Sequence, residues 1–248
     1  MSGHSKWSSI KHKKAAKDSK RGKLFTKLIK EITVAARSGG DVNGNPRLRT
    51  AVLTARASSL PNDTIERAIK KGSGQLDGQT FEEIDYEGYG PNGVAIMARV
   101  LTDNRNRTVS ELRFLFSKHG GNLGEAGSVA WMFHKCGVLQ VDKQGTDEDR
   151  LMELALEAGA DDVGDVGETF EVVCSPESLE AVRSAVEGGG LRLASAEVTM
   201  LPTSTVHLTG APAASALKLL EALEDHDDVQ GVSANLDVDA AELEQLSA

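Results

Sequence analysis

Apolar residues recur along the chain with two different periods, and the change of period divides the sequence into parts. Between residues 21 and 73 they return every three or four positions, which is typical of helices with one buried face. The first such stretch stops at Gly39-Gly40, the second starts at Pro46, and the third runs from Pro61 to Gly72. The pattern therefore predicts a unit of three helices.

The segment before this unit, residues 1–20, has almost no apolar residue at helical spacing. Because it has so little apolar surface to bury, we expect a flexible basic arm. The segment after the unit, GSGQLDGQ at residues 72–79, has the composition of a linker. The first two predicted parts are therefore an arm at residues 1–20 and a helical domain at residues 21–78.

Beyond the linker the period changes to that of strands. Two apolar stretches at residues 81–86 and 94–101 flank the sequence EGYGPNG and predict a hairpin, although a glycine-rich loop can also cradle a phosphate. Thr108 and Glu111 have the spacing of a helix start. We expect SVAWMF, at residues 128–133, to be a strand.

The stretch from residue 137 to residue 200 predicts a strand, a helix, two strands, a helix and a strand, which is the ferredoxin-like order. The strand, helix and strand that follow, between residues 204 and 236, are too few to bury a sheet face alone. We expect them to complete the sheet begun at Phe81. The predicted fold class is α+β: an N-terminal three-helix domain followed by two α+β (ferredoxin-like) domains, the third inserted in the second. The expected boundaries are 79–135 and 203–240 for the discontinuous second domain and 136–202 for the inserted third domain.

Basic and acidic residues, like the two apolar periods, are concentrated in different parts of the chain. The chain has 28 basic and 37 acidic residues, of which 17 basic and 5 acidic ones lie within residues 1–71. That part carries a net charge of +12, and residues 72–248, with 11 basic and 32 acidic side chains, carry −21. A basic segment on an otherwise acidic chain points to a polyanionic partner, most commonly nucleic acid.

The candidate nucleic-acid contacts are therefore the cations of the arm and of the helical domain, which can neutralise phosphates. Two arm residues, Trp7 and His12, can stack on bases. A solvated basic face that binds nothing is the alternative interpretation. The candidates in these two parts are Lys6, Trp7, Lys11, His12, Lys13, Lys14, Lys17, Lys20, Arg21, Lys23, Lys27, Lys30, Arg47 and Arg49.

Two further candidates, Arg105 and Arg107, precede the expected helix start at Thr108. Free backbone N–H groups at a helix N-terminus favour an anion, so these arginines can grip a phosphate there. The alternative is an internal salt bridge to one of the many nearby acids, and the sequence leaves both open.

The sequence gives little support to catalysis or to metal binding. It contains no GxSxG, GxxxxGK[ST] or HExxH motif. His134 with Cys136 offers two ligands without partners, and His226-Asp227-Asp228 is expected to be a solvated turn after a helix. We expect a non-enzymatic protein with no cofactor, no metal and no essential small-molecule ligand.

Two isolated cysteines, Cys136 and Cys174, fit a reducing cytoplasm. No stretch has the roughly 18 apolar residues of a membrane span, so no membrane contact is expected.

Seven blocks of the sequence, in order, resemble the YebC/PmpR family, whose eukaryotic relatives include the mitochondrial translational activator of cytochrome c oxidase. The resemblance implies one helical domain and two α+β domains, the third inserted in the second. The absence of a long extension before MSGHSKW favours a bacterial member. The blocks are GHSKWSSIKHKKAAKDSKRGKLFTKLIKEI, NPRLR, NDTIERAIKKG, DYEGYGPNGVA, TDNRNRT, FSKHGGNLGEAGSVAWMF and AEVTMLP.

The resemblance also implies a function without fixing the partner. Members of the family are described as probable DNA-binding transcriptional regulators, and others as ribosome-associated translation factors that help synthesis through sequences such as proline runs. The family therefore favours a regulator that binds DNA. The long arm, with no evident recognition helix, favours rRNA on physical grounds. A regulator that binds a small molecule is a third hypothesis, which rests on fold analogy.

Overall fold

The structure, a computed structural model, describes residues 18–78, 80–167, 169–239 and 242–243, with side chains from residue 21 onward. The helical domain consists of α2 (Asp18–Ala35), the short 3-10 helix η1 (Ala36–Ser38), α3 (Pro46–Ala57) and α4 (Asn62–Gly72). Its core contains apolar residues that the helical spacing predicted, among them Ile32, Leu48 and Ile65. The first helix begins at Asp18, three residues before the expected start, so its backbone includes part of the predicted arm.

The start of α3 is fixed by a single buried side chain. Asn45 accepts a hydrogen bond from the backbone N–H of Leu48, and its amide donates to the carbonyls of Ala35 and Gly39. Pro46 occupies the first turn, where a missing N–H costs nothing. Asn45 therefore caps α3 and ties it to the end of α2.

Helix α4 ends where it meets α2. A Cβ atom at Gly72 would lie 2.2 Å from the carbonyl oxygen of Thr33 and 2.7 Å from the Cβ atom of Ala36. This close approach requires glycine at the last position of α4.

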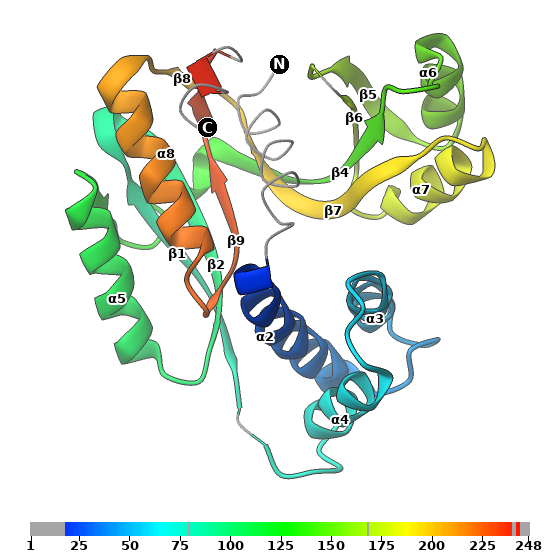
Figure 1. Cartoon of the computed structure of the whole chain (residues 1–248), viewed down its shortest axis with the longest axis horizontal. Helices are drawn as coiled ribbons and strands as arrows, with labels where there is room; N and C mark the ends of the chain where they lie inside the picture. Colours follow the sequence, from blue (N-terminus) through cyan, green and yellow to red (C-terminus); the bar gives the residue numbers. More distant parts are fainter. Residues whose placement is uncertain (1–17, 79, 168, 240–241, 244–248) are drawn as a thin grey trace.

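The second domain is built on a sheet whose strands come from distant parts of the chain. Strands β1 (Glu82–Tyr89), β2 (Ala95–Thr102), β3 (Asn122–Leu123) and β9 (Val229–Ala234) lie in the order β3-β1-β2-β9. Helices α5 (Arg105–Lys118) and α8 (Gly210–Glu224) cover one face of this sheet and share its apolar core (Figure 1). The EGYGPNG segment forms the predicted hairpin turn, closed by a 2.7 Å bond from the N–H of Gly90 to the carbonyl of Val94.

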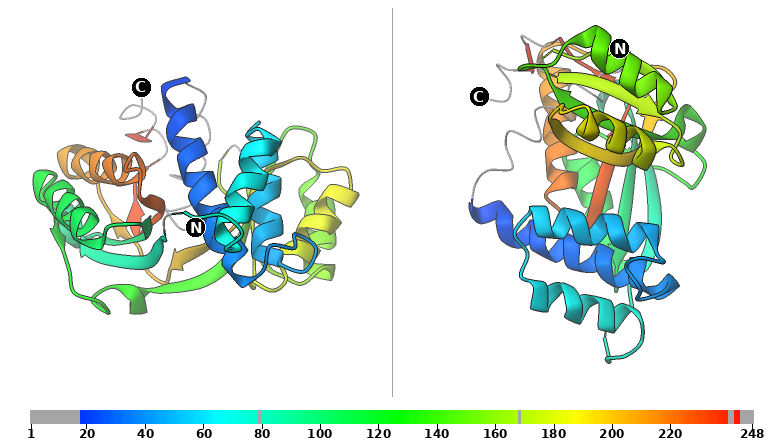
Figure 2. Two further views of the ribbon diagram at one scale, coloured as in Figure 1. Left: turned by 90° about the horizontal axis from the view of Figure 1, so that it is seen from below. Right: turned by 90° about the vertical axis from the view of Figure 1, so that its right-hand side faces the viewer.

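The third domain interrupts the second, as expected from the order of its elements. Its strands β4 (Phe133–Asp142), β5 (Ala160–Asp165), β6 (Thr169–Cys174) and β7 (Leu193–Pro202) form a fully antiparallel sheet in the order β5-β6-β4-β7. Helices α6 (Glu148–Glu157) and α7 (Leu179–Gly188) connect them. The α+β fold class with its inserted ferredoxin-like unit is confirmed, and Figure 2 shows the three helices of the helical domain beside the two sheets.

Two of the expected strands differ in the structure. Half of SVAWMF forms a short 3-10 helix, η3 (Ala130–Met132), and Phe133 instead starts β4, which runs without a break into the third domain. The strand expected at residues 204–209 shrinks to β8 (Val206–His207), which pairs in parallel with β10 (Leu236–Asp237). Strand β9 already occupies the edge of β2, so β8 finds its partner outside the main sheet. Among the described residues, no helix is long and apolar enough to cross a membrane.

Candidate nucleic-acid interface

The predicted contact residues fall into two groups. Eight have described side chains: Arg21, Lys23, Lys27, Lys30, Arg47, Arg49, Arg105 and Arg107. The backbone of Lys20 lies in α2, but its side chain is outside the described residues, as are Lys6, Trp7, Lys11, His12, Lys13, Lys14 and Lys17.

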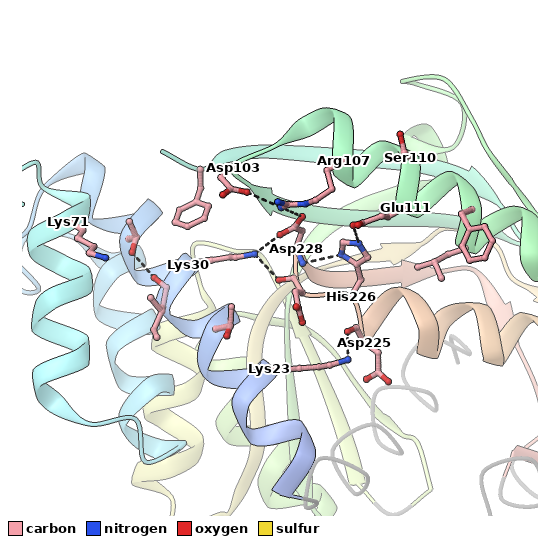
Figure 3. Close-up of a pocket in the computed structure, with 17 residues that line it drawn as sticks. Lys23, Lys30, Lys71, Asp103, Arg107, Ser110, Glu111, Asp225, His226 and Asp228 are labelled. Atoms are coloured by element: carbon pink, nitrogen blue, oxygen red, sulfur yellow. Dashed lines mark hydrogen bonds and ion pairs between the residues drawn. The ribbon is translucent and has the colours of Figure 1, made fainter. Parts of the chain in front are cut away.

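Three lysines of α2 face the second domain and bind one turn of it. Their spacing of four and three residues places Lys23, Lys27 and Lys30 on one side of the helix. Lys23 donates to the carbonyl of Asp225 at 2.9 Å, Lys27 to that of Glu224, and Lys30 to that of Asp227 at 3.0 Å. We call these contacts the lysine clamp, and the segment that it binds, residues 224–228, the acidic turn. Figure 3 shows Lys23 and Lys30 beside Asp225 and Asp228.

The clamp follows from the place of the acidic turn at the end of α8. The last carbonyls of a helix have no partner within the helix and carry the negative end of its dipole. Ammonium groups satisfy such carbonyls well. Lys23 and Lys27 therefore cap the C-terminus of α8 from another domain, and Lys30 binds the turn that follows it.

Asp228 lies at the centre of this junction. Its side chain is only 4% exposed and accepts a hydrogen bond from Lys30 at 2.6 Å. On its other side it accepts bonds from the hydroxyl of Thr108 at 2.6 Å and from the guanidinium of Arg107 at 3.0 Å. Burial by itself raises the pKa of Asp228, but the bonds from Lys30, Thr108 and Arg107 outweigh it and hold that pKa well below its usual range.

The sequence predicted that Arg105 and Arg107 precede the helix that starts at Thr108. In the structure they lie in the first turn of that helix. Helix α5 begins at Arg105, and Asn104 caps it by accepting a bond from the N–H of Arg107. The reason is that Asn104 is a better cap than Thr108, whose hydroxyl is used by Asp228. Arg107 pairs with Asp103 at 2.9 Å and with Asp228. Arg105 is exposed and pairs with no carboxylate among the described residues.

Arg47 forms a second bridge between the helical domain and the second domain. Its guanidinium binds both carboxylate oxygens of Glu83 on β1, at 2.9 and 3.0 Å, and also Glu31 on α2 at 2.9 Å. Burial lowers the pKa of Arg47, but the bonds to Glu83 and Glu31 outweigh it and raise the pKa above its usual value. Arg49 instead donates to the carbonyls of Val42 and Asn43 within its own domain.

A cleft with a volume of about 950 Å³ opens beside the lysine clamp, between the helical domain and the second domain. Cations, carboxylates and apolar side chains all line it, so neither positive nor negative charge dominates its surface. Its lining residues are Lys23, Thr26, Ile29, Lys30, Thr33, Lys71, Phe81, Asp103, Arg107, Ser110, Glu111, Phe114, Leu115, Asp225, His226, Asp227 and Asp228.

In this cleft Glu111, His226 and Asp228 place three possible metal ligands within 4.8 Å of one another. The imidazole of His226 does not fit that role. Its Nδ1 accepts a bond from the backbone N–H of Asp228 at 3.1 Å, so the proton of the neutral ring is on Nε2, which lies 2.8 Å from Glu111. Neither ring nitrogen then has a free lone pair for a metal. The same contacts correct the expectation of a solvated turn, because Asp228 is buried.

A buried carboxylate that the sequence did not single out organises the glycine-rich loop before β4. Glu87 accepts bonds from the backbone N–H groups of Gly127, Val129 and Ala130 at 2.6, 2.7 and 2.7 Å. Burial raises the pKa of Glu87, but these three bonds outweigh it and lower the pKa. The glycines and Glu87 are therefore parts of one structural unit, which holds the loop in place.

Two family models match successive parts of the chain. The model described as "TACO1/YebC protein N-terminal domain" matches residues 5–75, and "TACO1/YebC second and third domain" matches residues 81–236. The chain belongs to the TACO1/YebC family. The resemblance stated from the sequence is thereby confirmed, over nearly the whole chain.

Members of the TACO1/YebC family from several bacteria align with this chain along its length. A Geobacter sulfurreducens protein is 58% identical over 247 residues, which are 99% of this chain and 100% of that protein. A Koribacter versatilis protein is 56% identical, and the alignment covers 100% of both chains. Both are called "Probable transcriptional regulatory protein". A crystal structure of a conserved hypothetical protein from Aquifex aeolicus, 47% identical, superposes with a TM-score of 0.82 over 90% of this chain and 92% of that one.

Proposed function

We propose that this chain is a non-enzymatic regulator of gene expression that binds duplex DNA through its N-terminal arm and its helical domain. The division of charge carries the proposal: +12 over residues 1–71 and −21 over residues 72–248. A polyanion is attracted by the first part and repelled by the second. The names of the Geobacter and Koribacter relatives support a role in transcription.

Electrostatic contact with the phosphate backbone is the proposed mode of binding. Among the predicted contacts with described side chains, Arg21 in the helical domain is exposed and pairs with no described carboxylate, and the same holds for Arg105 at the start of α5. The arm cations add to this set. Contacts of this kind position a protein on DNA and carry little sequence information, so we expect weak discrimination between sequences.

The alternative target is ribosomal RNA. A basic arm without helical periodicity suits the irregular surface between RNA segments better than the groove of a duplex. In that case the protein would assist translation, with the same cations contacting RNA phosphates. A small-molecule-binding regulator is the remaining alternative, and the cleft of about 950 Å³ is where a ligand of that kind would bind.

Fluorescence anisotropy with a labelled duplex DNA and with a labelled rRNA hairpin, over a series of salt concentrations, tests the proposal. If about six phosphates are neutralised, log affinity for duplex DNA should fall against log salt with a slope of roughly −5. Deleting residues 2–20 should remove most of the binding. Arg21→Ala should make the slope less steep by about one.

Arg192→Ala is the matched control, since Arg192 is 85% exposed in the third domain and its loss changes the net charge equally. It should leave the slope unchanged. A slope near zero, or an equal effect of both substitutions, would refute binding through the helical domain. Tighter binding of the rRNA hairpin at the same salt would move the target from DNA to RNA.

A further inference from the structure

The helical domain and the second domain are joined by polar contacts and have separate hydrophobic cores. The apolar cluster of the helical domain lies within residues 25–69, and that of the second domain within residues 84–243. The lysine clamp and the ion pair between Arg47 and Glu83 bridge the two domains. The exposed contacts among them, those of Lys23 and Arg47, weaken as salt or a competing ion is added.

The bridging cations, Lys23, Lys27, Lys30 and Arg47, are among the contacts that the sequence predicted for phosphate binding. Lys30 is only 9% exposed, and its ammonium already binds the carbonyl of Asp227 and the carboxylate of Asp228. The guanidinium of Arg47 donates a hydrogen bond to each carboxylate oxygen of Glu83. A phosphate can therefore reach these two cations fully only if they leave the second domain.

The acidic turn presents groups that resemble a phosphate backbone to the row of lysines. Two carbonyl oxygens at the negative end of the α8 dipole, the carbonyl of Asp227 and the carboxylate of Asp228 line up along one side of α2. The ammonium groups thus have a substitute for phosphate oxygens within the same chain. The segment that connects the domains, residues 73–81, contains Gly74 and Gly78, and glycine-containing connections of this kind permit reorientation.

We infer that the acidic turn and Glu83 form an autoinhibitory latch, which occupies the phosphate-binding cations of the helical domain until nucleic acid displaces it. The inference rests on the proposed function and describes how nucleic-acid binding by the helical domain would be regulated. In the closed arrangement Lys30 is buried, and the guanidinium of Arg47 is paired with Glu83. Nucleic acid binds the open arrangement more tightly, so its apparent affinity is reduced by the fraction of molecules that are closed.

The latch can be weakened at Glu83 without touching a cation. Glu83→Gln removes the charge that holds Arg47, and Glu82→Gln, at the exposed neighbouring position on β1, is the matched control with the same change of net charge. The ion pair is partly exposed, with 42% of the Arg47 side chain and 38% of the Glu83 side chain accessible, which limits its contribution. We expect Glu83→Gln to tighten binding of a short duplex DNA about two- to fivefold relative to Glu82→Gln.

Domain separation is measured in the same variants by spin labels on Ala57→Cys in α3 and Ser117→Cys in α5, two exposed positions. The native thiols of Cys136 and Cys174 are buried, so the labels attach to the introduced ones. Glu83→Gln should broaden the distance distribution toward longer distances. Adding duplex DNA to the otherwise unaltered chain should do the same, and circular dichroism should show both variants folded.

The outcomes separate the latch from the proposed function. If the chain binds duplex DNA while the label distance stays unchanged, or if Glu83→Gln binds no more tightly than Glu82→Gln, the latch is wrong and nucleic-acid binding stands. If neither the unaltered chain nor Glu83→Gln binds DNA or RNA, the proposed function fails and the latch fails with it.

Discussion

Replacing Asp228 by asparagine should destabilise the protein far more than the same replacement one residue earlier. Asp228 and Lys30 are both nearly inaccessible, with side chains 4% and 11% exposed, and lie 2.6 Å apart. Removing one partner of a buried ion pair costs about 3–5 kcal/mol, because the other charge stays buried without compensation. Lys30 keeps its bond to the carbonyl of Asp227, so we expect a loss near the lower limit, about 3 kcal/mol.

Arg107 adds little to this figure. Its side chain is 44% exposed, and it retains Asp103 as a partner. The control is Asp227→Asn, which removes an equal charge from an exposed side chain while the backbone carbonyl that binds Lys30 is unchanged. It should lower the free energy of unfolding by less than about 0.5 kcal/mol.

Urea denaturation followed by far-ultraviolet circular dichroism measures both variants. The pH dependence adds a second test. Since the folded-state pKa of Asp228 is lowered, its contribution is fully present above the unfolded value of about 3.9 and is lost as the pH falls through the folded value. The difference between the unaltered chain and Asp228→Asn should therefore be constant from neutral pH down to about 5 and shrink below about 3.9. Equal stability of Asp228→Asn and Asp227→Asn at neutral pH would refute the account of this junction.

Three further substitutions or modifications test other parts of the structure. Gly72→Ala should destabilise the helical domain by about 1–3 kcal/mol, because the new methyl group would collide with α2. Gly22→Ala, at an open position inside α2, should stabilise it by up to about 1 kcal/mol. Thermal melts in which both substitutions shift the melting temperature in the same direction would contradict this packing. Glu87→Gln should lower the free energy of unfolding by about 1–3 kcal/mol and speed amide hydrogen exchange in the loop before β4. Glu125→Gln is the exposed control, and equal exchange rates in the two variants would show that Glu87 does not hold the loop. Burial raises the pKa of Cys136 to about 11, so its thiol should not react with a disulfide reagent at pH 8 until the protein is unfolded, and rapid reaction of the folded protein would show that the thiol is accessible.

Most elements of the fold could be predicted from the sequence because their signals are local. The order of strands and helices predicted for residues 137–200 is the order that the structure has from β4 to β7. The three helices of the helical domain followed from period and breakers in the same way. The prediction that the strand at residues 204–209 joins the sheet begun at Phe81 was wrong. Strand pairing depends on which sheet edge is already occupied, and residues far away along the chain decide that.

The junction at Asp228 could not be predicted for a similar reason. Lys30 and Asp228 are 198 residues apart, and a lysine on a polar helix face looks the same in the sequence whether it meets solvent, phosphate or a carboxylate. Charge counting does not distinguish a cation that is available for phosphate from one that is paired within the chain. The spacing of Lys23, Lys27 and Lys30 on one face was the one signal for a shared partner, and the sequence did not indicate that this partner lies at the end of α8.

Crosslinking in cells, followed by sequencing of both the DNA and the RNA bound to this protein, tests the central claim most directly. The account predicts recovery of DNA well above background, and loss of that recovery when residues 2–20 are deleted. Recovery concentrated on ribosomal RNA would transfer the same basic interface to the ribosome. Background recovery of both DNA and RNA from the full chain would contradict the claim that the basic N-terminal part of this protein binds nucleic acid.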